Sequence, residues 1–418
     1  MKRKIFIMVL VLIFSLTLIT ACSDEEASSN DSNKEGEKTI SFIHWRGEDE
    51  AVFNELIEKF EEENPDINVE MTVYPSEQYQ SNAQMLVRDG EVGDVFPVFP
   101  GSQFEIVTKA DLFMDLSDEE FVSNFNESLL DAGKKDGKIY ALPYQLVFNQ
   151  PVYNKGIFDE LGLEPPKDWD GFLEVGNTLK ENGYIPMAFP GADIGPGQLM
   201  NSMMMNNVKD EDIFTKLENG EVKATDEWWV KTLNDFKELA DKGYFQEGSL
   251  GTKHDGAIAL FAQEKAAMLG SGSYAMASVK EQNEDIVMGL LAPITVSEDE
   301  AEYEGIHTTT FMLGVNKNSK NPEAAKKFIE FLTLSENASE YANQTGQHLT
   351  IKEVDYTSEE LKNTSDWMDK NTRFQPRYLI SNIEVEKALI ASIQSVIGGT
   401  SPEKAAEEAQ AIIDQNIN

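Results

Sequence analysis

The segment from residue 137 to residue 172 constrains the fold more than any other part of the sequence, because prolines divide its β-prone residues. A first short run, 139–142, is followed at once by Pro143. A second run, 146–153, contains Pro151. Proline cannot donate a backbone N–H to a sheet, so these runs are poor candidates for two ordinary central strands. We interpret them as one extended segment that leaves one sheet and enters a second body of the protein, which predicts a hinge between two lobes.

The size and charge of the chain set broad limits on its class. The sequence has 418 residues, of which 41% are hydrophobic, so it can bury a large core or two lobes. It carries 74 acidic residues against 35 basic ones, and its formal net charge is −39. Such a field repels nucleic acid and anionic membrane surfaces. We therefore expect no nucleic-acid partner.

The N-terminus has the pattern of an export signal. Three basic residues at 2–4 precede an apolar run at 5–20, which falls short of the roughly 20 residues needed to span a bilayer. The run ends in Leu-Ile-Thr-Ala-Cys, which resembles a bacterial lipobox, and Cys22 is the only cysteine. We predict a signal peptide at 1–21, and a lipidated Cys22 with a flexible polar tether over 22–38. A lipid and a tether indicate the outer face of the membrane of a Gram-positive bacterium.

The first folded region alternates between strand and helix periodicity. In order, the predicted strand, helix, strand, helix and strand are 39–44, 50–64, 67–73, 79–89 and 95–99. A β-α-β-α-β order is typical of a parallel sheet covered by helices. Ligands of such sheets bind beyond the carboxyl ends of the strands. The loops at 44–49 and 99–104 are therefore candidate parts of a binding site.

Several phrases, in this order along the chain, resemble the family 1 extracellular solute-binding proteins of carbohydrate ABC importers, which are relatives of the maltose-binding protein. The phrases are ALPY at 141–144, YNK at 153–155, two prolines before Trp169, KAAM and GSGSY within 265–274, NPEAAKKFIEFLTLSENASEYANQTG at 321–346, and SPE at 401–403 before a last helix. Three departures are visible: Val152 stands where many members have an aromatic residue, Gln263-Glu264 stand in place of the usual Gly, and Tyr274 stands in place of the usual Trp. The resemblance spans nearly all of the mature chain.

This resemblance implies an α/β, two-lobed, periplasmic-binding-protein-like fold of class II. Each lobe is expected to hold a mostly parallel sheet flanked by helices, and three crossing segments are expected to form the hinge. The N-terminal lobe would comprise 39–144 plus 305–347, and the C-terminal lobe 145–304 plus 348–418. The implied function is the substrate-binding component of a carbohydrate ABC importer. Its implied partners are a sugar, expected to be an oligosaccharide bound in the interlobe cleft, and the membrane permease, with the protein itself a monomer.

A sugar site needs aromatic faces for the apolar side of the ring and planar polar groups for its hydroxyls. The candidates that the fold would place near the cleft are Trp45, Arg46, Glu48, Asp94, Phe99, Tyr144, Gln145, Asp193, Trp228, Tyr274, His307, Arg373 and Phe374. Core packing is the alternative for each aromatic residue. A surface salt bridge is the alternative for Arg373. The methionines at 200 and 203–205 are better explained by core packing than by a binding surface.

No catalytic motif is apparent. The four histidines are far apart and form no HExxH pattern, and no Gly-x-Ser-x-Gly elbow is present. We expect no enzyme, cofactor or metal. A surface glycoside hydrolase or lyase is one alternative function, because such an enzyme needs only two suitably placed carboxylates and the chain has many. A sensory binding protein without a permease, and a protein of the same fold for a glycerol phosphodiester or a polyamine, also stay open.

Overall fold

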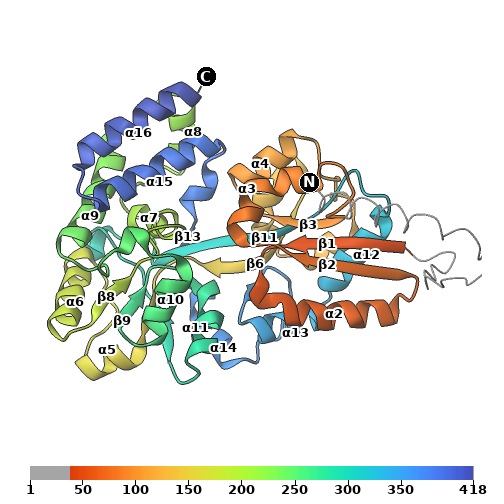
Figure 1. The fold of residues 1–418 in the computed structure, drawn as a ribbon, viewed down its shortest axis with the longest axis horizontal. Coiled ribbons are helices and arrows are strands. Elements are labelled where there is room, and N and C mark those ends of the chain that lie inside the picture. Colours follow the sequence, from red (N-terminus) through yellow and green to blue (C-terminus); the bar gives the residue numbers. More distant parts are fainter. Residues whose placement is uncertain (1–37, 418) are drawn as a thin grey trace, which may run out of the picture. The chain divides into compact units, whose positions relative to one another are not determined.

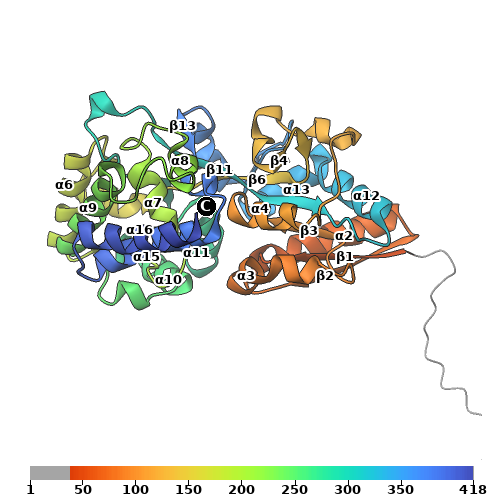
Figure 2. The ribbon, with the colours of Figure 1, turned by 90° about the horizontal axis from the view of Figure 1, so that it is seen from above.

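The computed structural model describes residues 38–417. The predicted signal peptide, Cys22 and the tether up to residue 37 lie outside the described residues. Within the described range, no helix is both long and apolar enough to cross a membrane. The elements form two sheets, each with its own helices and its own hydrophobic core (Figures 1 and 2).

The first sheet, as described within residues 38–417, has seven strands. They are β1 (Lys38–His44), β2 (Ile67–Val73), β3 (Val95–Val98), β6 (Leu142–Phe148), β11 (Gly305–Val315), β12 (His348–Leu349) and β13 (Thr372–Phe374). The order is β12-β6-β11-β3-β1-β2, and β13 pairs with β11. As predicted, β1 is parallel to β2 and to β3. However, β11 is antiparallel to β3 and β6, so the sheet is mixed rather than mostly parallel, because strands that cross between sheets return in the opposite direction.

The second sheet has the order β10-β7-β9-β8. Its strands are β7 (Val152–Asn154), β8 (Ile185–Ala188), β9 (Ala266–Leu269) and β10 (Met288–Leu290). It is also mixed: β8 is parallel to β9, whereas β7 is antiparallel to β9 and β10. A short hairpin, β4 (Lys134–Lys135) and β5 (Lys138–Ile139), stands apart from both sheets.

Helices with one apolar face cover both sheets. Those that accompany the first sheet are α2 (Glu50–Glu63), α3 (Ser76–Val87), α4 (Ser102–Lys109), α12 (Pro322–Leu332) and α13 (Ser335–Thr345). The remaining helices are α5 (Lys155–Leu161), α6 (Trp169–Glu181), α7 (Gly195–Met204), α8 (Ile213–Glu218), α9 (Glu227–Asp241), α10 (His254–Ala262), α11 (Met276–Gln282), α14 (Glu359–Thr364), α15 (Ile383–Ile397) and α16 (Pro402–Asn416). In Figure 1, α15 and α16 lie side by side.

Local sequence explains where these helices begin and end. The Asp168 side chain accepts a hydrogen bond of 2.7 Å from Gly171 N and caps α6, as predicted. Gly162 ends α5 at φ 64°, a backbone conformation that glycine adopts without a steric penalty. Met200 and the methionines at 203–205 are all buried, which confirms their predicted place in a core.

The proline-divided segment crosses between the two sheets. β6 belongs to the first sheet, residues 149–151 follow it, and β7 belongs to the second, as predicted. One detail differs: β6 runs through Pro143 rather than ending before it. β12 pairs with β6 only at Gln145 and Leu146. It ends before it reaches Pro143, so the missing N–H of this proline breaks no hydrogen bond between the two strands.

The other two crossings lie against the first. Asn149 N donates to Ile306 O at 3.0 Å, and Ile306 N donates to the Gln150 side chain at 3.0 Å. Gln375 N donates to His307 O at 2.8 Å. Leu361 still packs in the core of the first sheet, whereas Ile380 packs in the core of the second. We therefore propose that the third crossing follows Leu361, later than the predicted boundary at 347.

Candidate binding cleft

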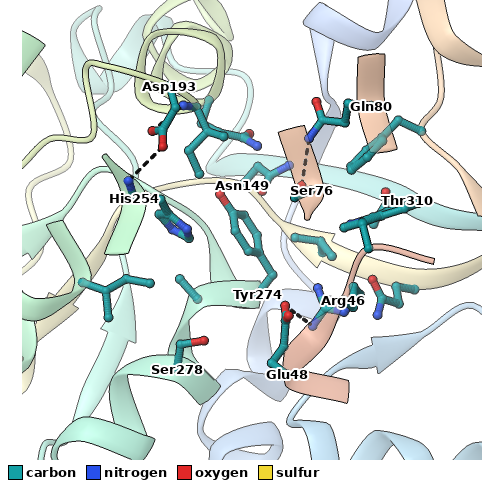
Figure 3. Close-up of a pocket in the computed structure, with 18 of the residues that line it drawn as sticks. Arg46, Glu48, Ser76, Gln80, Asn149, Asp193, His254, Tyr274, Ser278 and Thr310 are labelled. Atoms are coloured by element: carbon teal, nitrogen blue, oxygen red, sulfur yellow. Dashed lines mark hydrogen bonds and ion pairs between the residues drawn. The ribbon is translucent and has the colours of Figure 1, made fainter. Parts of the chain in front are cut away.

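A cavity of about 440 Å³, here called the central cavity, lies between the two sheets. One wall comes from the loops after β1 and β3 and from the start of α3. The facing wall comes from the starts of α7 and α10 and from the segment leading into α11, and strands β6 and β11 form the floor (Figure 3). The parallel strands β1 and β3 end at the same edge, so their loops meet there, as the sequence predicted.

An aromatic pair forms the apolar part of the first wall. The rings of Trp45 and Phe99 are stacked with centroids 4.1 Å apart. Trp45 also lies against Tyr79, 5.2 Å between centroids, and is only 9% exposed. Phe99 also lines the cavity and is half-buried, so it is more exposed than Trp45.

Arg46 is fixed beside this pair by two carboxylates. Its guanidinium forms an ion pair with buried Asp49 and a second one, at 3.3 Å, with Glu48. Burial alone lowers the pKa of Arg46, but the charges of Asp49 and Glu48 raise it above its usual range. Tyr341 donates a hydrogen bond of 2.5 Å to Asp49, and Gln145 donates one of 2.6 Å to Tyr341. This chain of contacts links the loop after β1 to the cavity floor.

The facing wall carries a second connected polar group. The Ser271 hydroxyl donates to the Tyr274 hydroxyl at 2.8 Å, so it accepts from His254 Nε2 at 3.0 Å. His254 N donates to the Asp193 carboxylate at 3.0 Å. Burial lowers the pKa of His254, which keeps the ring neutral at pH 7, although Asp193 and Asp255 oppose the shift. Figure 3 shows Asp193, His254 and Tyr274 on one side of the cavity and Arg46 and Glu48 on the other.

Four residues that line the cavity hold a buried side-chain oxygen with no hydrogen-bond partner among the described residues. They are Gln145 Oε1, Asn149 Oδ1, Gln198 Oε1 and Thr310 Oγ1. Unpaired buried polar atoms are uncommon in native proteins and need an explanation. Each of these oxygens can accept a hydrogen bond from a hydroxyl group. The site is thus able to bind a ligand rich in hydroxyls, with aromatic rings available for its apolar faces.

Seven predicted residues line the central cavity: Trp45, Arg46, Glu48, Phe99, Gln145, Asp193 and Tyr274. Whether they contact a ligand stays a prediction. Within residues 38–417, no group of three or more His, Cys, Asp or Glu side chains is arranged to hold a metal ion.

Three other predicted residues lie in packed parts of the structure, so their predicted placement is corrected. Asp94 accepts from both the N–H and the hydroxyl of Ser41, each at 2.7 Å, and thereby joins strands β1 and β3. Tyr144 lies on the opposite face of β6 from Gln145, fully buried, because side chains alternate along a strand. Trp228 packs against Trp229, with ring centroids 5.5 Å apart, at the edge of the second core.

The last three lie near the third crossing and outside the central cavity. His307 Nδ1 lies 3.0 Å from the Thr372 hydroxyl. Arg373 donates to Met205 O at 2.9 Å and to other backbone carbonyls. It therefore neither lines the central cavity nor forms the surface salt bridge that was its predicted alternative. Phe374 contacts the His307 ring and lines a separate cavity of about 320 Å³. Alternation along β11 turns His307 away and Thr308 toward the central cavity.

Sequence reasoning missed several lining residues. Thr308 and Thr310 are two residues apart on β11, and period-two alternation along the phrase HTTTF could have found them. Asn149 lies in the first crossing. In such a segment, a sequence pattern does not distinguish a residue that packs from one that binds a ligand. Other missed residues are Ser76, Gln80, Gln198, His254, Ser278 and Tyr378.

A two-lobed α/β fold with a polar and aromatic cavity between its sheets defines a class of solute-binding proteins. The family model described as bacterial extracellular solute-binding protein matches residues 45–339, and the chain belongs to this family. This confirms the resemblance and the predicted fold class, and it supports a location outside the cytoplasm, either extracellular or periplasmic.

Known relatives agree with this assignment. The multiple sugar-binding protein of Streptococcus mutans is 25% identical over 343 residues, which cover 81% of this chain and 80% of that protein. The melibiose/raffinose/stachyose-binding protein of Bacillus subtilis is 24% identical and covers 81% of this chain and 79% of its own length. A solved chitin oligosaccharide binding protein is 22% identical, with a TM-score of 0.80, and covers 91% of this chain and 99% of its own. That likeness supports the fold.

Proposed function

We propose that the protein is the substrate-binding component of a carbohydrate ABC importer and that it captures an oligosaccharide in the central cavity. The observation that carries this proposal is the set of unpaired acceptor oxygens in the same cavity as the Trp45–Phe99 pair. Sugars offer hydroxyl donors at the ring edge and apolar C–H faces, which match both features. The two relatives from Streptococcus mutans and Bacillus subtilis are both sugar-binding proteins, which supports the same class of ligand.

The mechanism follows from a site shared by two lobes. A sugar first contacts one wall and the floor, and contacts to the second wall become available when the lobes rotate about the three crossings. The ligand favours the closed arrangement only by the additional contacts made there. The closed protein then presents a joint surface of both lobes to the permease, whose partner subunits hydrolyse ATP. The protein itself performs no bond cleavage.

The proposal includes the place of the protein in the cell. A lipid on Cys22 would hold the protein on the outer face of the membrane of a Gram-positive bacterium, and the polar residues at 23–37 would act as a tether. We propose that it works there as a monomer beside its permease.

The experiment is thermal unfolding of the body Lys38–Asn418, which forms one compact unit, against a panel of sugars from one to four units. A ligand at 100 times its dissociation constant adds about 2.7 kcal/mol of stability, which shifts the midpoint measurably. A shift with one class of sugar is expected. No shift with any sugar, but a shift with a phosphodiester or a polyamine, would overturn the carbohydrate assignment and keep the fold.

Two variants test the position of the site. Trp45→Ala and Tyr274→Ala remove an aromatic ring from opposite walls, and each is expected to weaken sugar binding about tenfold. Trp228→Ala is the matched control, because this ring lies outside the cavity. Unchanged affinity in both Trp45→Ala and Tyr274→Ala would show that the sugar binds elsewhere.

A further inference from the structure

A second cavity, of about 360 Å³, lies next to the central cavity and is also lined from both lobes. Glu48 lines both cavities, which makes it their shared boundary. The neighbouring residue Asp49 faces the second cavity, while Arg46 faces the central one. The two spaces are therefore adjacent parts of one cleft, separated at the loop after β1.

The segment 273–282 lines both cavities, and a different face of the segment lines each one. Tyr274 and Ser278, four residues apart, face the central cavity. Ser273 and Ala277, also four residues apart, face the second cavity. Residues at this spacing lie on the same side of a helical segment, so one short element serves both spaces. Ser273 is held in place because its hydroxyl accepts a hydrogen bond of 3.1 Å from Phe148 N at the first crossing.

His348 lines the second cavity and has one buried ring nitrogen that makes no hydrogen bond within residues 38–417. The residue is 3% exposed and lines this cavity. Its Nε2 lies 3.1 Å from the Thr364 hydroxyl, whereas its Nδ1 has no hydrogen-bond partner within residues 38–417. Burial lowers the pKa of His348 to about 4, so the ring is neutral at pH 7. A neutral ring can either donate or accept at Nδ1 according to its tautomer, which suits a hydroxyl group.

The rest of the lining is rich in acceptors. Glu48, Asp49 and Glu281 contribute carboxylates, and α13 ends at the cavity with Thr345. The last carbonyl groups of a helix have no partner inside the helix and carry partial negative charge. These groups favour hydroxyl donors, as the unpaired oxygens of the central cavity do. Lys280 also lines the second cavity, and its Nζ donates to Glu284 O at 2.8 Å.

We propose that the second cavity is a further sugar subsite, in which an oligosaccharide that fills the central cavity passes beside Glu48 and places its next unit against His348. This inference rests on the proposed function of the central cavity. It predicts that the protein discriminates its ligands by length, because a single sugar unit occupies only one of the two spaces.

The test uses Ala277, a half-buried residue on the wall of the second cavity. Ala277→Phe fills the space, and Ala277→Ser is the matched control that leaves it open. The body Lys38–Asn418 of each variant is titrated calorimetrically with sugars of one to four units from the series that shifts its thermal midpoint. Galactose, melibiose, raffinose and stachyose form one such series. We expect wild type to bind the longer sugars at least tenfold more tightly than the single unit. Ala277→Phe should remove that gain, and Ala277→Ser should retain it.

A second variant gives an independent readout. His348→Phe keeps an aromatic ring but removes both ring nitrogens, Nδ1 and the Nε2 that contacts Thr364. We expect it to lower affinity about three- to tenfold for the longer sugars only. Equal binding of all lengths by wild type, or an equal loss for short and long sugars in Ala277→Phe, would overturn the second subsite and leave the proposed function intact. If no sugar binds to wild type, the proposed function fails, and this inference fails with it.

Discussion

The hydroxyl of Ser102, in the first turn of α4, donates a hydrogen bond of 2.7 Å to Glu386 in α15. The other carboxylate oxygen of Glu386 accepts from Arg377 Nε at 2.8 Å. α4 packs in the core of the first sheet and α15 in the core of the second. Glu386 therefore joins the two lobes next to the third crossing, and both of its oxygens are in use.

Removing the charge of Glu386 should be costly. Glu386→Gln leaves the largely buried Arg377 without its counter-charge, and we expect the free energy of unfolding to fall by about 3 kcal/mol. Ser102→Ala removes one hydrogen bond and should cost about 1 kcal/mol. Urea unfolding of both variants measures the difference. Similar small losses in the two variants would show that the ion pair adds nothing to the bond with Ser102.

Phe99 is expected to contribute to ligand binding in its own right. Phe99→Ala removes the ring that stacks on Trp45, and sugar affinity should fall about tenfold, or about 1.4 kcal/mol. Phe99→Tyr retains a stacking ring and should bind within about a factor of three of wild type. Calorimetric titration of the two variants tests this. A Phe99→Ala variant with wild-type affinity would mean that the pair is purely structural.

Acid should destabilise the protein through its buried histidines. Burial, and then the charge of Arg46, lower the pKa of His44 to about 3, and burial lowers that of His348 to about 4. The unfolded chain, with histidine pKa near 6.5, binds these protons first. The contribution of these histidines to stability is therefore fully present above pH 6.5. It is lost as the pH falls from 6.5 to the folded pKa values.

The histidine effect can be separated from that of the carboxylates. The protonation of His348 alone accounts for about 3 kcal/mol once the pH is below 4. His348→Phe should thus show a shallower decline of the urea midpoint between pH 6.5 and 4 than wild type does. Parallel declines in the two proteins would contradict this.

Cys22 is expected to carry the membrane anchor. Cys22→Ala removes the only thiol, so the protein should move from the membrane fraction to the medium when expressed in a Gram-positive host. Fractionation followed by immunoblotting measures this. The folded body should keep its sugar affinity, because residue 22 lies outside the body that holds the cleft.

Strong local patterns made much of the fold predictable. The alternation at Ile40 and Phe42, the capping residue Asp168 and the terminating Gly162 each act over a few residues, so the sequence carries their effect directly. The direction of β11 depends instead on how the chain returns after a distant crossing, and no local pattern encodes it. The same is true of the strand that continues through Pro143, which is tolerated only because β12 is short.

The cavity-lining residues that lie in loops were easier to predict than those that lie in strands. Trp45 and Phe99 follow parallel strands, so the general rule for such sheets places them at one edge. Tyr144 and Gln145 are adjacent in sequence, yet one is buried in the core and the other lines the cavity. The face of a strand that meets the cleft is set by the sheet register. When the register is unknown, the alternation of side chains does not tell which of the two faces of the strand meets the cleft.

The floor of the central cavity is formed by the same strands that cross between the lobes. In the proposed lobe rotation, Asn149 and Thr308 lie at or next to the crossing segments, so we expect their contacts with a ligand to change little. The walls, in contrast, change their separation. Substitutions in the floor should change the sugar affinity of the open and the closed form by the same factor. Substitutions in the walls should instead change the ratio of closed to open protein. How tightly the protein holds its cargo, and how often it offers that cargo to a transporter, can therefore evolve separately.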